Sequence, residues 1–198
     1  MFDVSNDIAI KQHTPDGVKE VTVSFPTDEQ WIARAAKSKM TSRSIGNGKS
    51  TSEVANAEKV NSELFDQIFR GGAELDEYEK SEVIGRLSRA EVIESSSSPS
   101  GYEVKLKVPG GDTLHSLKMP SARQVAEYRR YAVRVVEGRR GASEISINLR
   151  ASMELYDALK VSVTGYAAAI PAIHKSAVIS EVLAMLDSLN DDCDVEGF

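Results

Sequence analysis

Residues able to carry out acid–base, nucleophilic or metal chemistry are few and scattered in this 198-residue chain. The three histidines, His13, His115 and His174, fall in an expected turn, strand and helix without metal-ligand spacing. The single cysteine, Cys193, lies in an acidic tail with no histidine beside it. The sequence therefore supports neither a zinc site nor Cys–His catalysis. It also lacks a G-x-S-x-G elbow and a dinucleotide-binding motif, so we expect no catalytic residue, metal or cofactor.

A glycine-containing segment at residues 41–51, TSRSIGNGKST, matches a phosphate-binding loop only in part. The P-loop motif needs a glycine five residues before its Gly-Lys pair, but Arg43 stands there and no apolar strand precedes the segment. We interpret the segment as a flexible connection. Its Arg43 and Lys49 are suited to contact a phosphate or a carboxylate of a partner.

Two carboxylates provide the strongest catalytic alternative. Asp66 and Asp157 occupy matching positions in two similar stretches, and a pseudo-twofold axis would bring them together as a general acid–base pair. Both fall on amphipathic helical patterns, where an exposed aspartate is ordinary. An enzyme is therefore the third of the functions that we consider.

The densest charge feature is a group of five arginines within twelve residues. Three interpretations remain open: a solvated helix end, an acidic protein partner or a nucleic-acid backbone. An acidic tail offers complementary carboxylates from the same or a neighbouring copy, which places protein contact above nucleic acid. The predicted partner-binding residues are Arg129, Arg130, Arg134, Arg139 and Arg140 of the arginine cluster and Asp191, Asp192 and Asp194 of the tail.

The elements that would position these residues occur twice in the sequence. Residues 23–36, VSFPTDEQWIARAA, and residues 117–130, LKMPSARQVAEYRR, each end a strand pattern, turn at a proline and begin a capped amphipathic helix. Pro120 follows Pro26 by 94 residues (120 − 26). Two further blocks keep the same order: residues 63–66 match 154–157, and residues 80–84 match 175–179. Small drifts in spacing are what loop-length changes between two copies produce.

These repeats predict an α+β protein that is internally duplicated, with two modules of a β-hairpin plus helices packed as a pseudo-symmetric pair. The predicted modules are residues 1–94 and 102–190, followed by an acidic tail at 191–198. Residues 95–101, SSSSPSG, are either a linker between the modules or the loop of a hairpin. The alternative is one irregular α+β domain with accidental sequence echoes.

Hydrophobic periodicity locates the expected elements. We expect Trp31 to anchor the first capped helix on its hairpin. The apolar stripe of the last helix is wide enough for both a core and a subunit interface. The expected helices are one from Thr27, one from Ser52 to Arg70, one at 75–87 with Tyr78 inward and Glu79 outward, one at 121–137, one at 152–161 and one from Pro171.

Composition restricts the remaining classes. The chain is 41% hydrophobic and 27% charged with a net charge of −6, which is typical of a soluble globular protein and argues against bulk nucleic-acid coating. We expect neither a signal peptide nor a membrane span, because no apolar run is long enough. One cysteine favours a reducing compartment.

Several segments together resemble small proteins encoded among the structural and tail-assembly genes of tailed bacteriophages. They are VSFPTDEQW, the loop with GNGKS, VKLKVPGG, LKMPSARQVAEYRR and IPAIHKSAVISEVL. The resemblance implies a non-enzymatic virion component or assembly factor, located in the virion or the host cytoplasm. Its implied partners are other phage structural proteins or copies of itself. The alternative is a nucleic-acid-associated accessory protein that uses residues 129–140.

Overall fold

The computed structural model describes residues 2–14, 17–38, 40–46, 49–54, 56–109, 111–137 and 142–191. Over these ranges the chain has a mixed α+β fold, in which six helices pack with antiparallel sheets. This confirms the predicted α+β class. None of the described helices combines the length and hydropathy that a membrane crossing requires.

The first part of the chain alternates hairpins and helices. Its elements are β1 (Ile8–Thr14), β2 (Gly17–Val23), α1 (Asp28–Lys37), β3 (Met40–Gly46), β4 (Lys49–Val54), α2 (Ala57–Ile68), β5 (Phe69–Gly72) and α3 (Glu77–Leu87). An additional strand, β6 (Glu91–Ser98), then leads into the second part.

The second part presents the same order of elements. They are β7 (Gly101–Val108), β8 (Gly111–Leu117), α4 (Ala122–Ala132), β9 (Val133–Glu137), β10 (Ala142–Ile147), α5 (Leu149–Leu159), β11 (Lys160–Thr164) and α6 (Ala172–Asp191). The elements from β7 to α6 therefore have the same order of strands and helices as those from β1 to α3.

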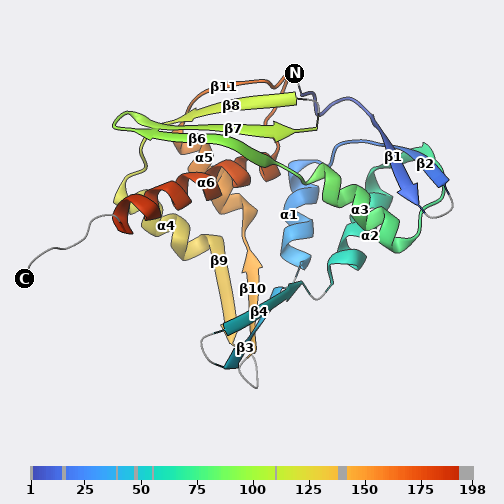
Figure 1. The fold of residues 1–198 in the computed structure, drawn as a ribbon, viewed down its shortest axis with the longest axis horizontal. Coiled ribbons are helices and arrows are strands. Elements are labelled where there is room, and N and C mark those ends of the chain that lie inside the picture. Colours follow the sequence, from blue (N-terminus) through green and yellow to red (C-terminus); the bar gives the residue numbers. More distant parts are fainter. Residues whose placement is uncertain are drawn as a thin grey trace, which may run out of the picture.

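The sheets repeat this parallel. One sheet has the order β1-β2-β5 and another the order β11-β8-β7-β6, so in both a hairpin is extended by the strand that follows a helix. Figure 1 shows the β6–β8 and β11 layer lying over α5 and α6, with α2 and α3 beside the β1–β2 hairpin. A further sheet, β4-β3-β10-β9, lies at the opposite end of the molecule and joins two hairpins from the two parts.

A single cluster of buried apolar side chains draws on both parts of the chain, from Phe2 to Val182. Trp31 is fully buried and its ring centroid lies 6.0 Å from that of Phe25, just after β2. The expected anchor of helix on hairpin is therefore confirmed. The stripe on α6 is used as core, since Val178, Ile179 and Val182 are fully buried.

The predicted helix starts are confirmed by their capping hydrogen bonds. The Gln30 backbone N–H donates to the Thr27 hydroxyl at 3.3 Å, and the Thr27 N–H donates back to Gln30 Oε1 at 2.9 Å. Ser121 and Gln124 make the same two contacts at the same distances. Each reciprocal pair satisfies backbone donors that the first helical turn leaves unpaired.

Two predictions were wrong in the sheet β4-β3-β10-β9. The helix expected at 121–137 ends at Ala132, and β9 follows it. The run VRVV has three β-branched residues, which fit a pleated strand better than a helix. The flexible connection expected at 41–51 instead contributes to β3 and β4, and α2 begins only at Ala57.

The serine-rich segment at 95–101 belongs to a hairpin, because Ser98 pairs with Gly101 where β6 turns into β7. Gly101 has a φ of +147°, and a Cβ there would lie 2.0 Å from the Leu117 carbonyl oxygen, so only glycine fits. Two inward–outward assignments on α3 were also wrong. Tyr78 is exposed, whereas Glu79 is buried and pairs with Lys19 of β2.

Candidate functional site

The described residues of the predicted partner-binding set lie on three elements. Arg129 and Arg130 lie in the last turn of α4, Arg134 in β9 and Asp191 at the end of α6. The others, Arg139, Arg140, Asp192 and Asp194, lie outside the described residues.

Of the predicted partner-binding residues, Arg129 and Arg130 of α4 already contact their own chain. The Arg129 guanidinium donates to the Asp187 carboxylate of α6, and both side chains are more than half exposed. The Arg130 guanidinium lies 5.4 Å from the ring centroid of Tyr131. An exposed ion pair contributes little to stability, so Arg129 remains available for exchange with a partner carboxylate.

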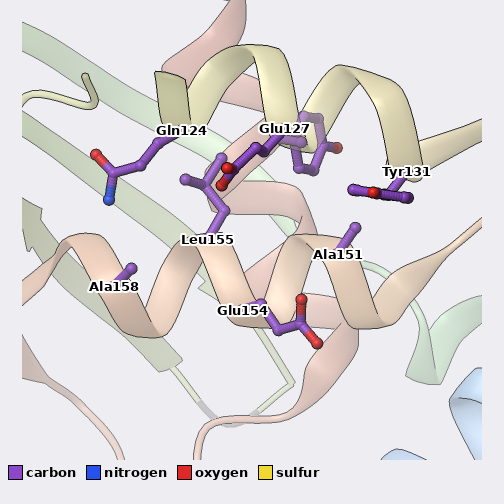
Figure 2. A pocket seen from close by; sticks show the side chains of 8 residues that line it. Gln124, Glu127, Tyr131, Ala151, Glu154, Leu155 and Ala158 are labelled. Carbon is purple, nitrogen blue, oxygen red and sulfur yellow. The ribbon is translucent and has the colours of Figure 1, made fainter. Parts of the chain in front are cut away.

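A groove of about 320 Å³ runs between α4 and α5. Figure 2 shows Leu155 rising from α5 toward α4, with Glu127 and Tyr131 on the α4 side and Glu154 on the α5 side. Arg123 donates to Glu127 at 3.0 Å along α4. The complete lining is Gln124, Glu127, Tyr128, Tyr131, Ala151, Glu154, Leu155 and Ala158. Carboxylates and tyrosines around an apolar floor suit a peptide segment that carries basic and apolar side chains.

Three exposed apolar residues lie where α4 meets the β9–β10 hairpin, and we call them the junction patch: Tyr131, Val133 and Ile147. Val133 and Ile147 are directly opposite in the β9–β10 ladder, and the Asn148 side-chain amide donates to the Tyr131 carbonyl at 3.2 Å. The exposed fractions are 58%, 48% and 49%. Large contiguous apolar patches on a protein surface mark contact sites, and we take these three residues as the candidate for one.

The two aspartates considered as a catalytic pair each contact a lysine of their own half. Lys80 donates to Asp66 at 2.7 Å, and Lys175 donates to Asp157 at 2.9 Å. These pairs link α2 to α3 and α5 to α6, which is a structural role. Among the described residues, no group of three or more His, Cys, Asp or Glu is arranged to hold a metal ion.

Two histidines that the sequence places far apart meet in a buried polar network. His115 of β8 contacts the Tyr156 hydroxyl through Nδ1 at 2.7 Å and the Thr113 hydroxyl through Nε2 at 3.1 Å. The Tyr166 hydroxyl lies 3.1 Å from Nδ1 of His174 and 3.4 Å from Nε2 of His115. Both imidazoles are fully buried.

Burial determines the protonation state of this network. Desolvation lowers the pKa of His115 to about 4. Desolvation, with a smaller contribution from the neighbouring His115, also lowers the pKa of His174 to about 4. Desolvation also raises the pKa of Tyr166 to about 12 and raises the pKa of Tyr156. All four groups are therefore neutral near pH 7. Because His115, His174 and Tyr156 are fully buried and Tyr166 is partly buried, the network is suited to holding β8, α5 and α6 together.

Sequence reasoning missed this network because its members come from a strand, two helices and a loop. One signal was present: Thr113, His115 and Leu117 occupy every second position of β8, which places their side chains on the same, inward face of the strand. The position of the second histidine had no comparable local signal.

No known protein family, curated protein or solved structure matches this chain.

Proposed function

We propose that this protein is a non-enzymatic structural or tail-assembly protein of a tailed bacteriophage, acting through protein–protein contacts in the virion or the host cytoplasm. The phage class rests on the sequence resemblance alone. The contact role rests on one structural observation, the junction patch of Tyr131, Val133 and Ile147 beside the α4–α5 groove.

The composition of this surface supports the contact role. Tyrosine and arginine are enriched where protein interfaces gain affinity, and Tyr131 is exposed with Arg130 over its ring. Apolar contact at the patch would supply affinity. The predicted charged residues of the arginine cluster and the acidic tail would set orientation and encounter rate.

We further propose that the chain is a duplicated module, because contacts as well as elements recur. In each half, the carbonyl that ends the second helix accepts a hydrogen bond from the backbone N–H just after the first hairpin. The asparagine before that helix donates its side-chain amide to a carbonyl in the last turn of the first helix. The second helix also carries an aspartate paired with a lysine of the last helix. The recurring hydrogen bonds are Ser24 to Ile68 and Lys118 to Leu159, Asn56 to Lys37 and Asn148 to Tyr131, and Lys80 to Asp66 and Lys175 to Asp157.

A capture experiment tests the proposed role. The full chain is mixed with the virion proteins encoded beside its gene, and complexes are followed by light scattering and cross-linking. Tyr131→Glu should abolish capture, because it places a charge in the patch. Tyr78→Glu, at a comparably exposed tyrosine on α3, is the matched control and should not change capture. A wild-type chain that neither self-associates nor captures any of these proteins would contradict the proposal.

The same preparations address the nucleic-acid alternative. Salt-dependent retention on duplex DNA that is lost in Arg130→Glu would favour an accessory role at nucleic acid. Deleting residues 191–198 should instead weaken protein assembly more at low salt than at high salt, because salt already screens part of the charge contribution.

A further inference from the structure

The sheet β4-β3-β10-β9 joins the two halves of the chain through backbone pairing. β3 and β10 are antiparallel, with Met40 opposite Ile145 and Arg43 opposite Ala142. Within the part of the chain that the structure describes, the outer strands β4 and β9 each pair on one side only. The sheet therefore ends in two open edges at one end of the molecule (Figure 1).

The two hairpins of this sheet correspond residue by residue. Met40 pairs with Val54 in β3–β4, and Val133 pairs with Ile147 in β9–β10. Both partners shift by 93 residues (133 − 40 and 147 − 54), so β9 corresponds to β3 and β10 corresponds to β4. The β3–β10 contact thus joins unlike strands, whereas a twofold axis would join like strands. A contact of this kind leaves one unused strand of each type.

We infer that β9 of one copy pairs antiparallel with β4 of a second copy, repeating between chains the contact that β10 and β3 make within one. The inference rests on the proposed role in assembly and names a partner and a surface for it. Shifting the β3–β10 register by 93 residues gives the register between copies: Val133 opposite Ser52 and Val135 opposite Ser50.

The backbone of β9 presents the right groups for this register. The Asn148 N–H donates to the Ala132 carbonyl at 2.8 Å, one step beyond the β9–β10 ladder. Hydrogen-bonded pairs alternate along an antiparallel ladder. Val133 and Val135 therefore direct their N–H and C=O groups toward the open edge. They are the two residues that the inferred register uses.

The alternation extends across the sheet to β4. Ile145 is opposite Val135 in a non-hydrogen-bonded pair, so its backbone groups face β3 and meet Met40. Continuing the alternation through β3 leaves the backbone groups of Ser50 and Ser52 facing outward from β4. Both open edges thus offer matching donors and acceptors at the residues that the register brings together.

The two open edges differ in the residues that can block pairing. β9, with the sequence VRVVE, has no proline or lysine, whereas β4 begins with Lys49, which lies outside the two serines of the inferred register. Val133 is 48% exposed. Because each copy uses a different strand on either side, the assembly grows head to tail and ends as a ring or a filament, depending on the rotation between copies.

Proline substitutions on the full chain test the inference. Size-exclusion chromatography with light scattering should show wild type as species larger than a dimer. Val135→Pro removes an N–H that β10 does not use, so it should give a monomer with the wild-type far-ultraviolet circular dichroism and melting curve. Val135→Thr, similar in shape and with its N–H retained, is the control and should assemble as wild type does. Loss of assembly in this control would overturn backbone pairing as the cause.

A complementation experiment identifies the two edges. Ser50→Pro blocks β4 and should also give a monomer. A mixture of the Ser50→Pro and Val135→Pro variants has one intact edge of each type, so it should form a 1:1 heterodimer and stop there. Dimers of either variant alone, or a mixture that stays monomeric, would overturn the inference.

The tests of this inference and of the proposed function can give different results. A chain that captures virion proteins through Tyr131 but does not self-associate through β9 retains its assembly role and loses this inference. A chain that does neither loses both.

Discussion

Under the proposed duplication, the helix pairs α1–α2 and α4–α5 are equivalent, but they differ in the side chains that lie between the two helices of each pair. Three side-chain hydrogen bonds cross between α1 and α2: Gln30 to Gln67 at 3.4 Å, Arg34 to Asn61 at 2.6 Å and Lys37 to Glu63 at 2.8 Å. At the positions of Lys37 and Glu63, the second pair has Tyr131 and Glu154, which line the groove. The second pair keeps one link at the positions of Arg34 and Asn61, where the Tyr128 and Ser152 hydroxyls lie 3.4 Å apart. Among the described residues it has no such link at the other two positions, and the groove lies there. The side chains at the seam, and not the fold, therefore determine whether a groove opens.

The interiors of the two halves differ in a related way. The positions of Lys19 and Glu79, which form a 2.8 Å ion pair, are taken in the second half by Thr113 and His174. The positions of the apolar residues Val21 and Phe65 are taken by the hydrogen-bonded His115 and Tyr156. One half therefore ties its hairpin to its last helix with a partly buried ion pair. The other uses a neutral network, which makes it the acid-sensitive half.

The largest expected effect is a loss of stability in acid. The pKa of His115 and of His174 is about 4 in the folded chain, against 6.5 as the ordinary value. As the pH falls, the unfolded chain binds protons first, so stability is fully present above pH 6.5 and is lost as the pH falls toward 4. Each histidine contributes roughly 3 kcal/mol at 1.36 kcal/mol per pKa unit.

Urea denaturation between pH 7.5 and 4.5 measures this loss. The variant His115→Val/Tyr156→Phe, which copies the Val21 and Phe65 pair into the second half, should lose about half of the pH dependence. A free energy of unfolding that is constant across this range in wild type would contradict the neutral network.

The next largest effect compares the anchors of α1 and α4. Trp31→Ala should lower the free energy of unfolding by roughly 3–5 kcal/mol, because it leaves a large cavity beside Phe25. Val125→Ala, at the matching position of α4, should cost only about 1–2 kcal/mol since two methyl groups are removed. Chemical denaturation at pH 7.5 compares the two. Equal losses would show that the halves depend on these anchors alike.

Local signals explain which elements could be predicted from the sequence. The starts of α1 and α4 are encoded within four residues by a hydroxyl, a glutamine and a preceding proline, so their capping was predictable. β9 could not be predicted, because its strand conformation depends on pairing with β10. The local sequence VRVV does not encode that contact. The junction patch and the groove were missed for the same reason: the exposure of Tyr131 depends on which side chains α5 places across the seam.

A smaller effect separates the hydrogen bond of His115 from its burial. Tyr156→Phe should cost roughly 1–3 kcal/mol, because it leaves His115 Nδ1 buried without that partner. Adding His115→Val should recover part of this loss, and we expect a coupling energy of about 0.5–3 kcal/mol in the double-mutant cycle. Denaturation of the two single variants and the double variant measures it. Strict additivity would indicate that the two groups do not depend on each other.

The smallest expected change in stability carries the sharpest functional contrast. Tyr131→Lys copies Lys37 into α4, where a lysine would face Glu154 as Lys37 faces Glu63 in the first half. Stability should scarcely change, because exposed ion pairs contribute little. Capture of virion proteins should weaken by roughly tenfold or more, a difference of about 1.4 kcal/mol in binding, since the groove closes and the patch loses its aromatic ring.

The reverse variant, Lys37→Tyr, removes a hydrogen bond between α1 and α2 without creating the β9 part of the patch, so it should not add a second capture site. Titration of both variants with the captured protein would measure this, and unchanged affinity in Tyr131→Lys would exclude the α4–α5 groove from the interface.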